Sequence, residues 1–226
     1  MTKWWSNVNA GGWPAFVMEP EEIGHTIPEF LTGNFREIAI PRWSRPRVHP
    51  NGPIQLDLDE EKRYRLHVWM KNPIAQQVVS TPIHDHAFDL ESWVLYGLLR
   101  NITYGFHHTQ TRPSYRLWEV VAMEGSETNL KPTDELGYLH EVTNDIIQAV
   151  EQYHIPPYVL HWAFPETDVV VTLISKKPRR PQAPSVAVPI NEKPDNDFRR
   201  GDVEQNLLWP IIAEALKLAG IRWSIV

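Results

Sequence analysis

The chain has 226 residues, 42% of them hydrophobic, which suits one sizeable domain with a packed core. It contains no cysteine, which excludes disulfides, thiolate metal sites and cysteine nucleophiles. The formal net charge of -6 argues against binding nucleic acid through a basic surface.

Targeting and membrane signals are absent from the sequence. The first residues, MTKWWSNVNAGGWP, lack the apolar stretch of a secretory signal, and no apolar run reaches the length of a membrane span. We therefore expect a cytoplasmic protein that does not interact with membranes. The 20 prolines favour a loop-rich β protein over a helical bundle, because proline interrupts helix interiors and central strands.

Residues 1–34 are rich in Trp, Pro and Gly and are expected to form an N-terminal extension, with a short helix in EPEEIGHTIPEFLTG. Short strand-like segments then recur with turn signals between them. In chain order they are REIAIPRW, IQLDLD, RYRLHVWM, TPIHDHAFDLESWVLYG, NITYGFHH, SYRLWEVVAMEG, YLHEVTN, IIQAVEQYH, VLHWAF and DVVVTLIS. This spacing predicts a mainly β domain, a sandwich or barrel, over residues 35–178.

Residues 179–226 differ from the domain before them. PRRPQAPSVAVPINEKPDNDFRR is rich in proline and charge and predicts an extended arm or linker. DVEQNLLWPIIAEALKLAG then predicts a helix, with a kink or restart at Pro210 and a C-cap at Gly220. We expect this helix to pack on the domain or on a second subunit of a homodimer.

The segment from Thr81 to Gly97 carries the strongest functional signal. His84 and His86 alternate along it, so their imidazoles are expected on the same face. An acid follows at Glu91, with Asp89 as a competitor, and His161 stands at the head of the apolar strand in PPYVLHWAF. Three neutral imidazoles and a carboxylate suit a divalent metal and leave coordination positions for water, dioxygen or substrate.

These residues resemble the two sequence motifs of the cupin family. H-x-H-x4-E-x5-G is similar to the first motif, and P-x4-H is similar to the core of the second, except that Tyr158 stands where glycine is usual. The resemblance covers about residues 35–177. It implies a single jelly-roll β-barrel whose interior holds one metal ion, bound by His84, His86, Glu91 and His161.

Within the cupins, RYRLHVWM followed by PIHDH is similar to thiol dioxygenases, which use three histidines and ferrous iron. The resemblance implies Fe(II), with Mn, Ni or Zn as alternatives, and a small-molecule substrate. Arg65 or Arg63 would bind a substrate carboxylate, although either arginine could instead face solvent. His67 and Trp93 are expected as walls of the substrate pocket.

Tyr104 and His108 are candidates for a group that transfers a proton or orients dioxygen; otherwise they are packed or exposed side chains. Three functions remain open at this point. The first is an Fe(II) dioxygenase acting on a small organic substrate. The second is a redox-neutral isomerase or lyase whose metal polarises a carbonyl. The third is a barrel that binds a small molecule without turnover.

Overall fold

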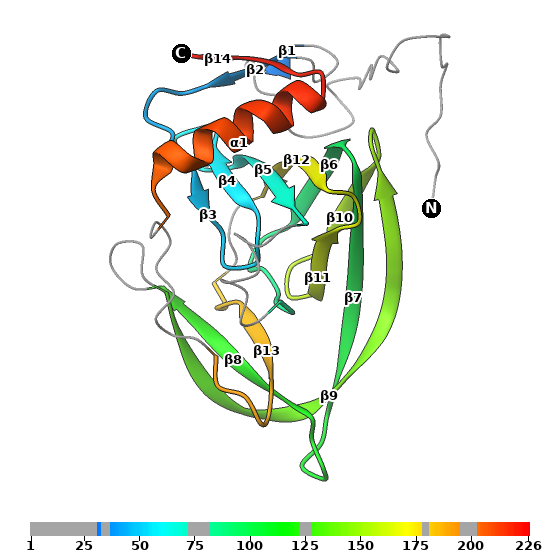
Figure 1. Ribbon diagram of the computed structural model, residues 1–226. Helices are drawn as coiled ribbons and strands as arrows, with labels where there is room; N and C mark the ends of the chain where they lie inside the picture. Colours follow the sequence, from blue (N-terminus) through cyan, green and yellow to red (C-terminus); the bar gives the residue numbers. More distant parts are fainter. Residues whose placement is uncertain (1–30, 33–36, 72–81, 123–127, 178–180, 195–202) are drawn as a thin grey trace.

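The computed structural model describes residues 31–32, 37–71, 82–122, 128–177, 181–194 and 203–226 (Figure 1). The predicted N-terminal extension, residues 1–34, lies outside these ranges apart from its strand β1 (Leu31–Thr32), so the helix expected there is not described. The described residues are mainly β and include one helix, which confirms the predicted class. No helix among them is both long and apolar enough to cross a membrane.

One sheet contains six strands in the order β10-β6-β12-β5-β4-β3. The apolar segment VVVTLISK forms β12, which lies between β5 and β6 and is antiparallel to both. A strand buried at the centre of a sheet has no solvated face, which explains its continuous apolar run. The strands are β3 (Arg47–Val48), β4 (Ile54–Asp57), β5 (Tyr64–Met70), β6 (Leu90–Tyr96), β10 (Gln152–Ile155) and β12 (Val169–Lys176).

A second sheet contains five strands in the order β11-β7-β9-β8-β13. Its longest strand, β9, runs for 21 residues, where the sequence predicts only the two shorter strands YLHEVTN and IIQAVEQYH. The first half of β9 pairs with β8 and the second half with β7, so backbone pairing holds a polar segment extended. The strands are β7 (Leu98–His108), β8 (Tyr115–Ala122), β9 (Thr128–Gln148), β11 (Leu160–Pro165) and β13 (Ser185–Pro189).

The C-terminal region differs from the extended arm that the sequence predicts. Strand β13 lies inside that arm and pairs with β8. Helix α1 (Gln205–Leu218) continues through Pro210. The side chain of Pro210 is exposed, whereas Leu208 before it and Ile212 after it are buried. The helix ends as predicted beside Gly220, which has φ +68° and donates its N–H to the carbonyl of Lys217 at 3.0 Å.

The segment after α1 returns to the start of the described chain. Strand β14 (Arg222–Ile225) pairs in parallel with β2 (Glu37–Ile40), and β1 pairs with the other edge of β2. Figure 1 shows these three strands beside α1 at one end of the molecule.

The two faces of the six-stranded sheet are covered differently. On its outer face, Leu66, Trp93 and Leu95 belong to the same apolar cluster as the buried side of α1. On its inner face, Trp69 and Val94 pack with Ala163 of the five-stranded sheet. Because side chains alternate along a strand, the inner face also carries a row of polar residues. They are Gln55, Asp57, Arg65, His67 and Lys176.

A short segment before β6 joins the two edge strands of the five-stranded sheet. His84 forms antiparallel bridges with both His161 of β11 and Val186 of β13. The backbone N–H of His161 donates to the carbonyl of His84 at 2.8 Å, and the N–H of Asp85 donates to the carbonyl of Ser185 at 2.9 Å. This pairing places His84 directly opposite His161.

Candidate metal centre

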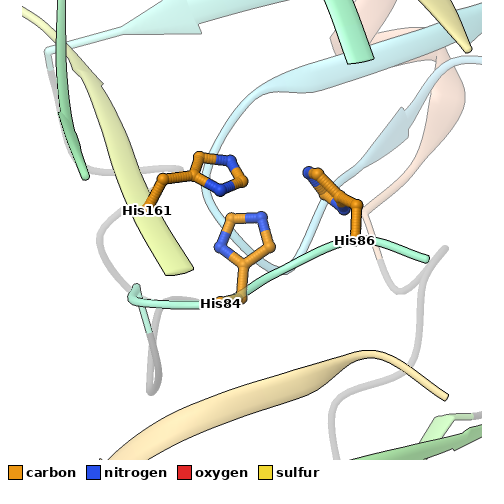
Figure 2. A group of neighbouring side chains, drawn as sticks. All are labelled: His84, His86 and His161. Carbon is orange, nitrogen blue, oxygen red and sulfur yellow. The ribbon is translucent and has the colours of Figure 1, made fainter. Parts of the chain in front are cut away.

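Three histidines from two distant segments of the chain converge on one point (Figure 2). One ring nitrogen from each of His84, His86 and His161 lies within 4.8 Å of the other two. The ring centroids are 4.5 Å apart for His84 and His161, 4.7 Å for His84 and His86, and 4.9 Å for His86 and His161. This group could hold a metal ion, as the His-x-His spacing and the later histidine predict.

Burial keeps all three imidazoles neutral. It lowers the pKa of His84 to about 4 and that of His161 to about 3, and it holds the pKa of His86 well below its usual value. Repulsion from the charge that neighbouring histidines would carry also lowers the pKa of His86 and of His161. Neutral imidazole is the form that binds metal, so the group is ready to act as a ligand set at pH 7.

Backbone carbonyls fix the tautomers of two of these rings. Nδ1 of His84 lies 3.0 Å from the carbonyl oxygen of Pro82, and Nδ1 of His161 lies 3.1 Å from that of Val159. A carbonyl oxygen only accepts hydrogen bonds, so each Nδ1 carries the proton and each Nε2 keeps its lone pair. Donation of the second ring N–H to a carbonyl is the usual support of a metal-binding histidine.

Asn51 contacts the group from the turn between β3 and β4. The N–H of His49 donates to the carbonyl of Pro53 at 2.8 Å and closes this turn. Nδ2 of Asn51 then lies 2.8 Å from Nε2 of His84, whose lone pair accepts the hydrogen bond. Binding of a metal at this nitrogen requires the Asn51 amide to turn away. The Asn51–Gly52 pair is a turn signal, but nothing in the sequence predicts its contact with His84.

Two neighbours support the His-x-His segment. The ring of Phe88 stacks on His86, with centroids 4.7 Å apart and an interplanar angle of 15°. Asp85 is buried, and its carboxylate accepts the backbone N–H of Ser185 at 2.7 Å. Burial raises the pKa of Asp85 to about 6. Asp85 therefore ties the segment to β13, while its two histidine neighbours reach the metal centre.

Glu91 lies outside the three-histidine group. It shares the outer face of β6 with Trp93 and Leu95, and its Oε1 is 3.2 Å from Nζ of Lys177. Asp89, the competing acid, has its Oδ1 3.1 Å from Nε2 of His154. The group that the structure brings together among the described residues thus consists of three imidazoles without a carboxylate.

The structure separates the two candidate arginines. Arg63 is exposed and pairs with Asp59 at 3.2 Å and with Glu61 at 3.4 Å. Arg65 is on the inner face, where its Nε donates to Oδ1 of the buried Asp57 at 3.0 Å. Of the two arginines, Arg65 is thus the one that lies on the inner face, where it is paired with Asp57.

The two candidate pocket walls lie on opposite faces of the six-stranded sheet. His67 is on the inner face and is buried. Trp93 is on the outer face, in the apolar cluster beneath α1. Only His67 therefore faces the space between the two large sheets.

Tyr104 and His108 lie away from the three histidines. Tyr104 is paired with Leu160, and His161 is paired with Thr103, so Tyr104 and His161 point to opposite faces of their sheet. His108 is exposed, with Nδ1 4.0 Å from a carboxylate oxygen of Glu135.

A scan against models of known protein families gave no match, and a search of curated proteins found no significantly similar sequence.

Proposed function

We propose that the protein is a mononuclear non-haem Fe(II) dioxygenase of the cupin type, acting on a small organic substrate. The observation that carries the proposal is a set of three neutral imidazoles, each partly or fully buried, from which Glu91 is excluded. Three ligands leave about half the positions of an octahedral ion open. A fourth protein ligand would leave two positions, too few for dioxygen together with a substrate that binds through two atoms.

Two features of the backbone support a cupin-type jelly roll. The two large sheets face each other, and the segment around His84 joins both edges of the five-stranded sheet. Tyr158, which stands where the second cupin motif usually has glycine, has φ +62°, a conformation that glycine adopts readily. Tyr158 thus has the backbone conformation that a glycine at this position of the motif would favour.

The residues of the chain would position and shield the reacting groups. When bound, Fe(II) would supply the electrons and open coordination positions that dioxygen activation requires. The carbonyls of Pro82 and Val159 hold the lone pairs of two ligands toward the centre. Trp69 and Ala163 pack together between the sheets, which keeps water from one side of the site.

The first experiment is elemental analysis of untagged protein and of the variants His84→Ala, His154→Ala and Glu91→Gln. We expect near-stoichiometric iron in the unchanged protein and its loss in His84→Ala, because the group loses one of three ligands. His154 is an exposed histidine paired with Asp89, so His154→Ala is the matched control and should retain iron. Glu91→Gln should retain iron as well, because Glu91 lies on the outer face of β6.

Full iron occupancy in His84→Ala would contradict the proposed site. The iron-loaded protein should also consume dioxygen in the presence of its substrate and lose activity without dioxygen. Zinc, nickel or manganese at the same histidines, with turnover under anaerobic conditions, would favour the redox-neutral isomerase or lyase instead.

A further inference from the structure

Two buried polar side chains on the inner face of the six-stranded sheet have unused hydrogen-bonding atoms. His67 is 7% exposed, and neither of its ring nitrogens has a hydrogen-bond partner among the described residues. Gln55 is directly opposite His67 on β4, and its Oε1 also has no partner there. A buried polar atom without a partner loses the hydrogen bond it made to water when the chain was unfolded, so such atoms are rare without a reason. Their position on one face indicates that a polar molecule binds there.

Lys176 adds a cation to the same face. It is the last residue of β12, and its Nζ lies 5.3 Å from the ring centroid of Phe88, the residue that stacks on His86. Among the described residues, no carboxylate lies within ion-pair distance of this Nζ. A partly buried ammonium group of this kind can bind an anion from outside the protein.

The polar face borders the metal centre. Trp69 of β5 and Ala163 of β11 pack in one cluster between the sheets. Two residues earlier on the same faces of these strands are His67 and His161. The ring centroid of His67 also lies 5.9 Å from that of His49, which begins the turn whose Asn51 contacts Nε2 of His84. A small molecule held by His67 and Lys176 would thus reach the three histidines.

We propose that Gln55, His67 and Lys176 bind the substrate of the metal centre, and that this substrate is a small hydroxylated anion. The proposal rests on the function proposed above and adds the substrate class. Lys176 would bind the acidic group. Oε1 of Gln55 can only accept a hydrogen bond, and neutral His67 offers one donor and one acceptor, so a hydroxyl group suits both. Three neutral ligands leave the charge of a divalent ion uncompensated, which also favours an anion.

The charge of Lys176 makes anion binding depend on pH. Burial, and next the charge of Arg65, lowers the pKa of Lys176 to about 7, while Arg47 acts in the same direction and Asp57 and Asp59 oppose it. The ammonium form therefore predominates about one pH unit below this value and is lost as the pH rises through it. Affinity for an anion should fall over the same interval.

The test is calorimetric titration of the protein loaded with Zn(II), which binds the same ligands without redox chemistry. The probes are glycerate, glycerol, propionate and glycerol 3-phosphate, which separate the contributions of the acid and of the hydroxyl. We expect glycerate to bind at least about tenfold more tightly than glycerol and propionate, a difference of about 1.4 kcal/mol. Tighter binding of glycerol 3-phosphate would support the site and identify the acid as a phosphate.

Variants assign the two contributions. Lys176→Met should remove the advantage of glycerate over glycerol, and His67→Phe should remove its advantage over propionate. Lys177→Met is the matched control, because this neighbouring lysine pairs with Glu91 on the outer face, and it should leave both ratios unchanged. If His67→Phe does not fold, Gln55→Leu tests the same hydroxyl contact.

Equal binding of glycerate, glycerol and propionate would overturn the proposal, as would ratios that Lys176→Met and His67→Phe leave unchanged. The same titrations on the metal-free variant His84→Ala show whether glycerate binds without the metal. They therefore distinguish failure of the anion site from failure of the metal site. Selective binding of glycerate by a protein that takes up no metal in any form would support the anion site and refute the dioxygenase. Stoichiometric iron without selectivity for glycerate would support the metal site and refute the anion site.

Discussion

Tyr158 illustrates how one backbone conformation positions the metal centre. With φ +62°, this tyrosine donates its N–H to the carbonyl of His86 at 2.9 Å. It thereby holds the turn before β11 against the His-x-His segment. A residue with a Cβ is strained in this conformation by about 1 kcal/mol relative to glycine.

We therefore expect Tyr158→Gly to be about 1 kcal/mol more stable than Tyr158→Ala. Both variants lose the hydroxyl contact with the carbonyl of Gln182, so that contribution cancels in the comparison. Urea denaturation at pH 7 measures the difference in the free energy of unfolding. Equal stability of the two variants would show that the conformation costs nothing.

The residues of the site differ in how far the sequence predicts them. The histidines are found because alternation and the apolar strand after them are local signals. Glu91 matches the motif spacing, but the position of β6 turns it to the outer face, and residue counting does not reveal that rotation. Asn51 and Lys176 carry no local signal, because their proximity to the histidines depends on how distant strands meet.

At the level of elements, the contact between the His-x-His segment and β13 depends on Asp85. Its carboxylate accepts the N–H of Ser185 at 2.7 Å, although burial raises its pKa to about 6. Asp85→Asn keeps an oxygen acceptor and removes the buried charge, so the free energy of unfolding should change little. Asp85→Ala leaves the N–H of the half-buried Ser185 without its partner and should cost about 1–3 kcal/mol.

Chemical denaturation of both variants at pH 7, together with their metal content, checks this prediction. Asp85→Ala should also bind metal less well, because the segment that presents two ligands loses its anchor. Equal destabilisation by Asn and Ala would mean that the charge, and not the accepted hydrogen bond, holds the segment to β13.

Two strands show why element prediction from sequence succeeds only in part. β12 is predicted because a continuous apolar run is a local property. The polar first half of β9 lacks such a run and is held extended only by pairing with β8. β13 is short, and its apolar alternation is hidden in a proline-rich region; β8 supplies the partner that makes it a strand.

For the whole molecule, the buried histidines predict acid lability. The pKa of His84 is lowered to about 4 and that of His161 to about 3 in the folded protein, whereas both titrate near 6.5 when unfolded. Below pH 6.5 the unfolded chain binds protons that the folded chain does not, so stability is lost as the pH falls. The loss by pH 4 is on the order of 3 kcal/mol for each histidine.

Thermal unfolding of the metal-free protein between pH 7 and pH 4 measures this loss. A bound divalent ion should raise the melting temperature at pH 7 and steepen the decline, because protons compete with the metal for the same nitrogens. A melting temperature that does not change from pH 7 to pH 4 would contradict the buried, neutral state of the two rings.

The pairing of β14 with β2 has a kinetic consequence. Arg222 lies in register with Glu37, and the guanidinium contacts the carboxylate at 3.3 Å across a separation of 185 residues. Closing a loop of this length costs more entropy than closing the local hairpins of the large sheets. Contacts of high sequence separation slow folding, so this three-stranded sheet should assemble after the layers that carry the histidines. The metal ligands would then be in place before the chain has finished folding.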